Sequence, residues 1–400
     1  MSYESVRQQS SCPVPATEQV ARWFFEGKPP PTRFFHLLAS LDASYRRGEI
    51  LGSITTSPLP LAQRTFFELM DRNLGDPGLC KGALLAERYV VHLISTLLHA
   101  PGPYGSLTAG GSEANLVALW ALRKLRGKGM VIACDLVHHS VKKACNLLGL
   151  PLKLVPHTDS FTMDLDAVEQ VLQRQRVTAV VATVGHTCTG TIDPIWTLSK
   201  LCEAFDVPIH VDAALYAFIL PFVEEVLGIP PWDFRLPQIM SMTADPHKFA
   251  LAPIPSGSII VRNPSILRSI ATYVSYLAGG PTFSWLISGT RPGASAYATL
   301  SALLALGYPG LRKIALRALE LAKWFANELE QIPGVRLLTQ PVCNIVAFTT
   351  PCDRRVWRYL RHKRRFLSLT PTHLRVVIMP HVKRKHLEDL LQALRSLLAR

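Results

Sequence analysis

Short apolar runs through the middle of the chain alternate with segments of helical periodicity. The segments 164–175 and 194–205 carry apolar residues at helical spacing, which is typical of amphipathic helices. Strands that are apolar on both faces and joined by helices predict a mostly parallel sheet covered on two faces. In such a sheet, ligands bind beyond the carboxyl ends of the strands. The candidate strands are 130–134, 152–156, 177–184, 208–212, 238–243 and 257–261.

The pattern changes after Gly293, where two long helical stretches are followed by short strands and a closing helix at 383–400. This order is typical of an α+β domain. The first fifty residues look helical and peripheral, and the PPPT stretch at 29–32 breaks them. We therefore expect three parts, which are an N-terminal helical segment (1–60), a large domain (61–292) and a small C-terminal domain (293–400).

The composition indicates a globular protein, because hydrophobic residues make up 48% of the chain and charged residues 18%. No apolar stretch is long enough to span a bilayer, and the N-terminus lacks the apolar segment of a signal peptide. We therefore expect a cytoplasmic protein with no membrane association. The eight cysteines are scattered without metal-type spacing, which favours reduced structural thiols.

A formal net charge of +14 raises the question of nucleic-acid binding. The densest basic run is 354–365, in which Arg354, Arg358, Arg361 and Arg365 recur at helical spacing and predict one exposed stripe. No nucleic-acid motif accompanies them, so a solvated basic helix is the favoured interpretation and nucleic acid is not the expected partner. Attraction of anionic substrates or cofactors is compatible with either interpretation.

The segment that begins at Thr108 suggests a phosphate site. Gly110 and Gly111 permit a tight turn, and Ser112 is a plausible N-cap of the apolar-periodic helix that follows. Free backbone N–H groups and the positive end of a helix dipole bind phosphate well. An ordinary capped helix explains the same residues, so this motif is weak by itself.

Three more residues follow predicted strands. Asp212 is either a loop residue or a buried anion that faces a cationic ring nitrogen. His138 is either structural or able to stack on an aromatic ring, and Lys248 is either a surface charge or a partly desolvated nucleophilic amine. Together with the phosphate turn, these residues supply what pyridoxal 5'-phosphate requires. The combination is much more specific than any one member.

The motifs resemble those of the group II pyridoxal-phosphate-dependent decarboxylases, and most closely the archaeal L-tyrosine/L-aspartate decarboxylases. The resemblance runs from about residue 50 to the C-terminus. It implies the α/β fold of fold-type I enzymes, similar to aspartate aminotransferase, with a mostly parallel central sheet and a smaller α+β C-terminal domain. The matching motifs are NLGDPGLCKG (73–82), GGSEANL (110–116), GTIDPI (190–195), HVDAA (210–214), DPHK with PIPSG (245–257), SGTRPG (288–293) and LRVVIMPH (374–381).

The resemblance also implies roles for individual residues around the cofactor. Lys248 would carry pyridoxal phosphate as a Schiff base, Asp212 would pair with the ring nitrogen, and His138 would stack on the ring. The remaining cofactor-binding residues would be Gly111, Ser112, Thr187, Ala214 and Thr290. Thr290 would reach the phosphate of the neighbouring subunit, because these enzymes usually work as homodimers with shared active sites.

On the substrate side, the resemblance implies that Arg375 holds a carboxylate of a small amino-acid substrate and that His247 and Tyr276 move protons. The chain departs from the family pattern at Ser112, His186, Cys188, Tyr216, Ala217 and Ala250. These changes leave the cofactor set in place but add bulk near the substrate side. They bear on the substrate more than on the chemistry.

The favoured activity is decarboxylation, either of L-aspartate to β-alanine or of L-tyrosine to tyramine. These products would serve coenzyme A and methanofuran biosynthesis respectively. A carbon–carbon lyase related to sphingosine phosphate lyases, or an aminotransferase, remains the alternative on the same scaffold. A non-enzymatic role in nucleic-acid binding is the least favoured. The sequence does not choose between the two amino acids, because the loop around 53–60 could build either a second cation site for aspartate or an apolar slot for tyrosine.

Overall fold

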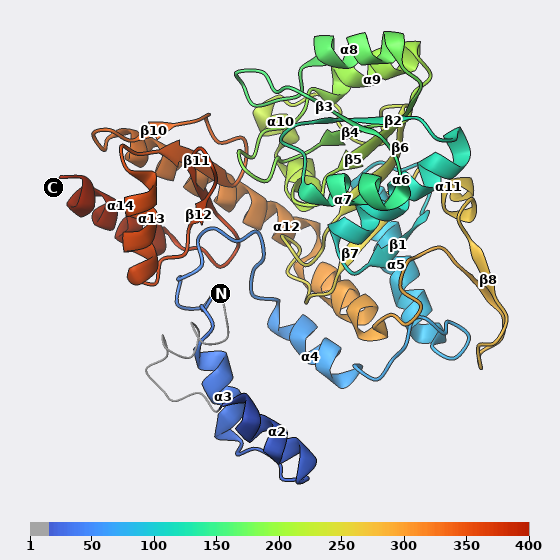
Figure 1. Cartoon of the computed structure of the whole chain (residues 1–400), viewed down its shortest axis with the longest axis horizontal. Helices are drawn as coiled ribbons and strands as arrows, with labels where there is room; N and C mark the ends of the chain where they lie inside the picture. The colour runs from blue at the N-terminus through green and yellow to red at the C-terminus, as the bar shows by residue number, and fades with distance from the viewer. Residues whose placement is uncertain (1–15, 400) are drawn as a thin grey trace.

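The computed structural model describes residues 16–399, and its larger part is built on a seven-stranded sheet surrounded by helices (Figure 1). Six of the strands run parallel, and β7 is antiparallel to both of its neighbours, β1 and β6. The predicted mostly parallel α/β sheet is therefore confirmed. In spatial order the strands are β1 (Gly105–Thr108), β7 (Gly257–Val261), β6 (Ile239–Ala244), β5 (Ile209–Asp212), β4 (Val177–Thr183), β2 (Met130–Cys134) and β3 (Leu152–Val155).

Both faces of this sheet are buried, because alternate side chains of each strand enter different apolar clusters. Val131 and Ala133 pack with helices α6 and α7 on one face, whereas Ile132 and Cys134 join the larger cluster on the other. Every residue of β4 is buried. The two-sided burial explains why the strands read as continuous apolar runs. The helices of this part are α4 (Pro60–Glu68), α5 (Lys81–Leu97), α6 (Gly111–Arg126), α7 (His139–Leu148), α8 (Leu165–Arg174), α9 (Ile195–Ala204), α10 (Glu224–Leu227) and α11 (Pro264–Arg268).

A second, four-stranded antiparallel sheet lies in the C-terminal part of the chain. The long helix α12 (Gly293–Glu330) bends at Gly307, where φ is 58°, and runs from the large sheet to the small one (Figure 1). The expected domain boundary at residue 293 coincides with its first residue. The small sheet contains β10 (Arg336–Leu337), β11 (Ile345–Thr349), β13 (Leu374–Val377) and β12 (Ser368–Leu369), and helices α13 (Asp353–His362) and α14 (Arg384–Leu398) accompany it.

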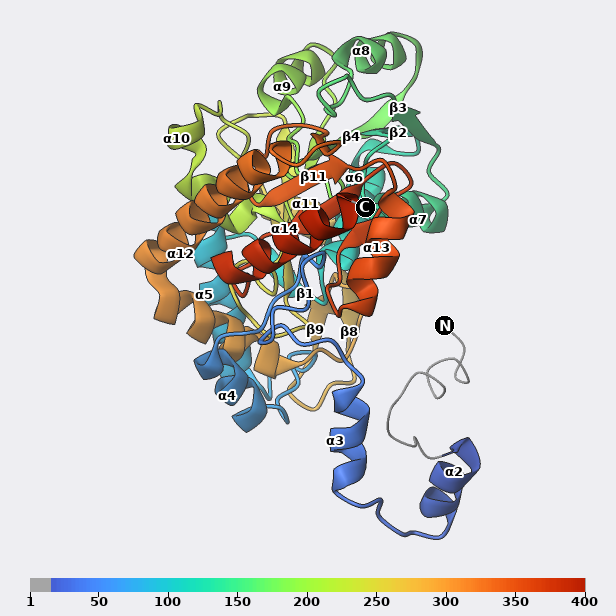
Figure 2. The same ribbon diagram turned by 90° about the vertical axis from the view of Figure 1, so that its left-hand side faces the viewer.

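Two peripheral features extend from this body. Helices α2 (Thr17–Phe25) and α3 (Arg33–Ser40) project away from it in both views (Figures 1 and 2), and none of their side chains is fully buried. The second feature is a hairpin of β8 (Thr272–Val274) and β9 (Thr282–Ser284). The break predicted at 29–32 falls between α2 and α3, while the part of the N-terminal prediction that covers residues 1–15 lies outside the described residues.

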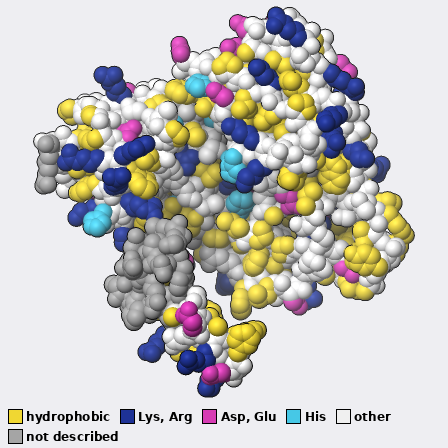
Figure 3. All heavy atoms as spheres, in the orientation of Figure 1, with side chains coloured by type: hydrophobic (Ala, Val, Ile, Leu, Met, Phe, Trp, Pro, Cys, Tyr) yellow, Lys and Arg dark blue, Asp and Glu magenta, His cyan; other side chains and the backbone are white. Residues whose placement is uncertain are grey.

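The predicted stripe of exposed arginines lies on helix α13, except for its last member. Arg354, Arg358 and Arg361 are exposed on α13, and Figure 3 shows many Lys and Arg side chains over this small lobe. The helix ends at His362, however, so Arg365 leaves the stripe and forms an ion pair with Asp389 at 3.0 Å. Among the described residues, no helix is long and apolar enough to cross a membrane, and the seven described cysteines are free thiols.

Candidate active site

Several strands of the large sheet end at one edge, and the residues that follow them surround a cavity of about 490 Å³. The N-terminal segment at Ile54 and Thr55 closes one side, and Ile254 contributes from the turn before β7. The cavity therefore occupies the position where ligands bind in sheets of this kind. The predicted residues that line it are Gly111, Ser112, His138, Thr187, Asp212, Ala214, His247 and Lys248.

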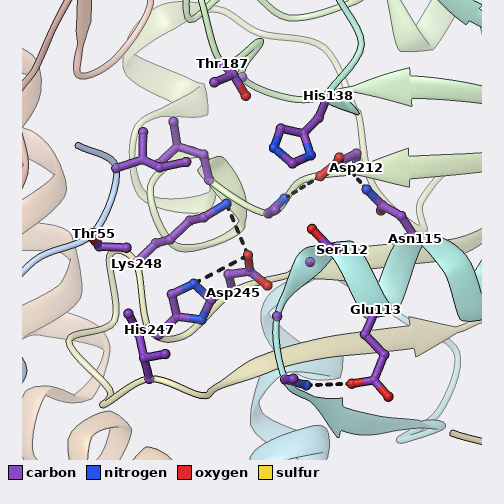
Figure 4. Close-up of a pocket in the computed structure, with 18 of the residues that line it drawn as sticks. Thr55, Ser112, Glu113, Asn115, His138, Thr187, Asp212, Asp245, His247 and Lys248 are labelled. Atoms are coloured by element: carbon purple, nitrogen blue, oxygen red, sulfur yellow. Dashed lines mark hydrogen bonds and ion pairs between the residues drawn. The ribbon is translucent and has the colours of Figure 1, made fainter. Parts of the chain in front are cut away.

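Lys248 reaches the cavity from the turn that follows β6 (Figure 4). Its Nζ lies 3.1 Å from Oδ2 of Asp245, and Oδ1 of the same carboxylate is buried without a hydrogen-bond partner. His247 Nδ1 donates to the backbone oxygen of Ser256, which leaves Nε2 free on the cavity side, 3.8 Å from Asp245 Oδ2. Burial lowers the pKa of His247, so this ring is neutral near pH 7.

Asp212 is the last residue of β5, and hydrogen bonds fix both of its oxygens. Asn115 Nδ2, from α6, donates to Oδ2 at 2.7 Å, and the backbone N–H of Ala214 donates to Oδ1 at 3.1 Å. The carboxylate is buried yet lines the cavity. A buried carboxylate without a cationic partner requires such donors, and it also presents a negative charge to any ligand in the cavity.

His138 lies at the N-terminus of α7, across the cavity from Lys248 (Figure 4). Its Nδ1 accepts from the backbone N–H of Ser140 at 3.3 Å and lies 2.8 Å from the Ser140 hydroxyl. Burial lowers the pKa of His138, although the carboxylate of Asp212 opposes this shift. The imidazole is therefore neutral near pH 7 and fixed in orientation, as an aromatic stacking partner must be.

Close packing at the start of α6 leaves no room for a Cβ on Gly111 or on the facing Gly257. A Cβ on Gly111 would lie 2.9 Å from Asp245 Oδ2 and 3.1 Å from the Ala214 Cβ, and a Cβ on Gly257 would lie 2.4 Å from the Gly110 Cα. Glycine is therefore required where the turn packs against β7. The first residues of α6, from Gly111 to Glu113, line the cavity, and an open helix N-terminus is suited to an anion.

Three predicted site residues lie elsewhere. Tyr276 is 85% exposed beyond β8, and Thr290 is an exposed residue that lines a neighbouring small pocket. Arg375, on β13, is buried outside the cavity lining. Its guanidinium donates to the backbone oxygens of Thr187 and Gly52, which joins the small sheet to the wall of the cavity. The single chain therefore does not bring these three residues to the cavity.

His186, one of the departures from the family pattern, is fully buried behind the cavity wall. Its Nε2 lies 2.9 Å from Asp193 Oδ1; burial opposes a charge on the ring, but the Asp193 carboxylate outweighs burial and raises the pKa. Cys134 is close enough for the three side chains to suggest metal ligation. Both Asp193 oxygens accept backbone N–H groups, however, so the pair is better explained as a brace for the loop at 185–191.

Sequence reasoning missed Asn115 and Asp245 as site residues, whereas Ile54 and Thr55 lie in the loop around 53–60 that the sequence offered as a wall of the substrate slot. Asn115 and Asp245 stand inside the quoted motifs GGSEANL and DPHK, so their positions were visible, but the motifs do not say which side chains point inward. Ile54 and Thr55 follow no strand of the large sheet and line the cavity because the N-terminal segment pairs with the small lobe at Gly52 and Phe366. That long-range pairing leaves no local signal.

The donor set fits pyridoxal phosphate. A buried amine, a buried carboxylate, a neutral imidazole and an open helix N-terminus all line one cavity, and the orphaned Asp245 Oδ1 shows that the protein alone does not satisfy its polar groups. Lys248, Asp212, His138 and the turn at Gly111 and Ser112 are the residues that would hold the aldehyde carbon, ring nitrogen, ring face and phosphate.

Comparisons with known proteins agree with this chemistry. Residues 83–350 match the model of the pyridoxal-dependent decarboxylase conserved domain. The chain is 40% identical over 363 residues to the L-aspartate decarboxylase of Thermococcus kodakarensis, covering 90% of this chain and 94% of that protein. It is 37% identical to a probable L-tyrosine/L-aspartate decarboxylase of Methanothermobacter thermautotrophicus, covering 88% and 98%. The solved structure of a Burkholderia pseudomallei sphingosine-1-phosphate lyase is 26% identical, covers 93% of each chain and superposes with a TM-score of 0.81.

Proposed function

Because this chain belongs to the pyridoxal-dependent decarboxylase family, and so is an amino-acid decarboxylase that uses pyridoxal 5'-phosphate, we propose that it converts L-aspartate to β-alanine and CO₂. The observation that carries the proposal is the shared cavity of Lys248 and Asp212, at the carboxyl edge of a mostly parallel sheet. The name of the Thermococcus relative supports the choice of aspartate.

Each residue of the cavity then has a defined task. When bound, the cofactor supplies an electron-withdrawing ring that accepts the electron pair left at Cα as CO₂ departs. Lys248 would provide the amine that holds the cofactor covalently, and Asp212 would keep its ring nitrogen protonated. The neutral His138 ring would pack against the cofactor ring, and the backbone N–H groups at the start of α6 would bind the phosphate beside Ser112. Thr187 and Ala214 complete the wall.

His247 is placed to move a proton. Its Nδ1 is committed to the Ser256 carbonyl, so Nε2 is the atom that accepts or returns a proton in the cavity. Lys248 Nζ is the second proton carrier, and Asp245 lies within reach of both. Tyr276 enters this scheme only if the segment beyond β8 closes over a cavity, either its own or that of a second subunit.

L-Tyrosine is the second candidate substrate. Ile54 and Ile254 give the cavity an apolar wall that would accept an aromatic ring. The Methanothermobacter relative, which is named for both amino acids, supports this option. β-Alanine and tyramine are the respective products, and we propose that the first serves coenzyme A biosynthesis or the second methanofuran biosynthesis. A reduced cytoplasmic setting would suit the seven thiols that are free among residues 16–399.

We also propose a homodimer with shared active sites. The projecting helix α2 exposes Phe24 and Phe25, and the hairpin of β8 and β9 exposes Tyr273 and Phe283, so both features present apolar surface that no other described residue covers. A second copy of the chain would cover such surface. It would also explain why Thr290 and Tyr276, which the family resemblance assigns to the site, lie away from the cavity of their own chain.

Product analysis of the purified holoenzyme tests the activity. We expect CO₂ and β-alanine from L-aspartate, with tyramine from L-tyrosine as the alternative. The Lys248→Ala variant is the matched control and must release neither amine. If no amino acid yields CO₂ while added amino acids still change the absorbance of the bound cofactor, decarboxylation is overturned in favour of a carbon–carbon lyase or aminotransferase.

A further inference from the structure

Asn115 is the centre of a buried hydrogen-bond network beneath the cavity. All of its side-chain hydrogen-bonding capacity is used, because Nδ2 donates to Asp212 Oδ2 at 2.7 Å and to Ser140 Oγ at 2.9 Å. Its Oδ1 accepts from the Thr243 hydroxyl at 2.8 Å and lies 2.9 Å from His210 Nε2. The link between Asn115 and Asp212 is visible in Figure 4. These contacts join α6 to three neighbouring elements.

The chemistry of the partners fixes the orientation of the amide. Asp212 Oδ2 can only accept, so the amide nitrogen must face it and the amide oxygen must face His210. His210 is completely buried, and burial lowers its pKa to about 4 despite the carboxylate of Asp212. The ring is therefore neutral at pH 7 and carries its proton on Nε2, where it donates to Asn115. Nδ1 then accepts from the Ser241 hydroxyl at 2.8 Å.

The second hydrogen of the Asn115 amide connects the network to His138 through Ser140. Because the Ser140 oxygen accepts from Asn115, its hydroxyl hydrogen is free to donate to His138 Nδ1, 2.8 Å away. His138 Nδ1 also accepts from the Ser140 backbone N–H, so this nitrogen carries no proton and Nε2 does. One amide thus donates to Asp212 and, by holding the Ser140 hydroxyl, also orients a donor toward His138, which lies on a different element of the cavity.

We propose that Asn115 is a positioning residue that holds the Asp212 carboxylate toward the ring nitrogen of the cofactor and reinforces the tautomer of His138 through the Ser140 hydroxyl, with neutral His210 locking the amide in place. This inference rests on the proposed function, in which Asp212 pairs with that nitrogen. The amide donor stabilises the carboxylate without adding a charge, which leaves the negative charge of Asp212 available to the ring.

Cofactor binding gives a test that does not depend on activity. We would measure the affinity of the apoprotein for pyridoxal phosphate and for 1-deazapyridoxal phosphate, which lacks the ring nitrogen. Asn115→Ala should weaken binding of pyridoxal phosphate about tenfold and binding of the deaza analogue less than threefold. Asn146→Ala, on the exposed face of α7, is the matched control and should change neither. Equal losses for both ligands would show that Asn115 only supports the fold.

Asp212→Ala separates the inference from its premise. If Asp212→Ala weakens the binding of both ligands equally, the assignment of Asp212 to the ring nitrogen is wrong. If Asp212→Ala weakens the binding of pyridoxal phosphate selectively and Asn115→Ala does not, only the role of Asn115 is overturned.

A measurement on the unmodified protein covers the case in which Asn115→Ala does not fold. Nitrogen-15 NMR of histidine-labelled holoenzyme should show His210 and His138 neutral and protonated on Nε2 at pH 7. Ser140→Ala should remove the hydroxyl donor to His138 and shift its Nδ1 resonance, while leaving His210 unchanged. A charged His210, or a proton on its Nδ1, would overturn the proposed network.

Discussion

Lys248 Nζ lies 3.1 Å from Asp245 Oδ2, in a cavity wall where the lysine side chain is 12% exposed and the aspartate 2%. The two residues are three positions apart in the turn after β6, so the same local geometry buries both charges. A lysine that is this buried needs a partner, because an isolated buried charge is costly. The ion pair thus holds the amine in the cavity of the cofactor-free protein.

Removing this partner should destabilise the apoprotein. Asp245→Asn keeps the shape of the side chain but leaves the Lys248 charge uncompensated, so we expect the free energy of unfolding at pH 7 to fall by about 3 kcal/mol. Urea unfolding of the apoprotein measures the change. Glu388→Gln, in the exposed pair with Arg384, is the control and should cost less than about 0.5 kcal/mol. Similar small losses in both variants would mean that Lys248 is not held by this pair.

The lysine itself should be indispensable to turnover. We expect Lys248→Ala to lose activity by at least about a thousandfold, because no other described amine lines the cavity to hold the cofactor covalently. The absorbance spectrum of the bound cofactor should also differ between the Lys248→Ala variant and the wild-type protein. Steady-state assays and spectra of the purified variant check both expectations, and full activity would refute the assignment.

The turn at the start of α6 should tolerate no side chain. Gly111→Ala places a Cβ 2.9 Å from Asp245 Oδ2 and 3.1 Å from Ala214, so either the turn or the walls must shift. We expect the affinity for pyridoxal phosphate to fall at least about tenfold, measured by absorbance titration. Gly310→Ala, in α12 far from the cavity, meets only the Leu306 side chain at 3.3 Å and should bind the cofactor normally. Normal binding by both variants would contradict a phosphate role for this turn.

Much of the fold follows from local sequence, and the resemblance to the decarboxylase family read from the motifs is confirmed. β2 and β7 have the predicted bounds because short, almost fully buried apolar runs flanked by turn signals leave little choice. β1 was not predicted, since only the four residues 106–109 separate Gly105 from the next glycines. The two-residue β12 exists only through its pairing with β13, which no local pattern specifies.

The site was predictable where a motif ends a strand and not where distant segments meet. Asp212 and Lys248 can be recognised from the sequence because each is a charged residue at or just beyond the end of a buried apolar strand. Asn115 gave no such signal, because its importance arises from a contact with Asp212, 97 positions later in the chain. Arg375 was expected beside a substrate carboxylate, but its partners Thr187 and Gly52 come from two other parts of the chain.

Shared active sites can be tested by complementation. If Thr290 acts on the cavity of the second subunit, mixing Lys248→Ala with Thr290→Asp should produce heterodimers in which one of the two sites has both native residues. We expect each variant alone to be nearly inactive and the refolded mixture to regain about a quarter of the wild-type activity, the mixed dimers being half of the population. Light scattering should give the mass of a dimer. An unimpaired Thr290→Asp variant or a monomeric mass would contradict the proposal.

Glu49 should make the attachment of the N-terminal segment depend on pH. Its buried carboxylate accepts from Arg364 Nε at 2.9 Å, from Arg47 Nε at 3.0 Å and from the Ser44 backbone N–H at 2.7 Å. Hydrogen bonds from Arg364, followed by those of Arg47 and Ser44, outweigh burial and lower the pKa of Glu49 to about 2. A lowered carboxylate pKa stabilises the folded state above the unfolded value of 4.5, and this contribution disappears as the pH falls from 4.5 to about 2.

The comparison with Glu49→Gln isolates that contribution from the other carboxylates. At pH 7 we expect the wild-type protein to be more stable by about 1 to 2 kcal/mol, a value reduced by solvent screening because Arg47 and Arg364 are half exposed. The difference should be constant down to about pH 5 and shrink toward zero near pH 2, as measured by urea unfolding at each pH. Glu388→Gln should show little difference throughout. If the difference in the free energy of unfolding stays constant down to pH 2.5, the arginines do not stabilise an ionised Glu49. The stabilisation by this side chain would then come from packing.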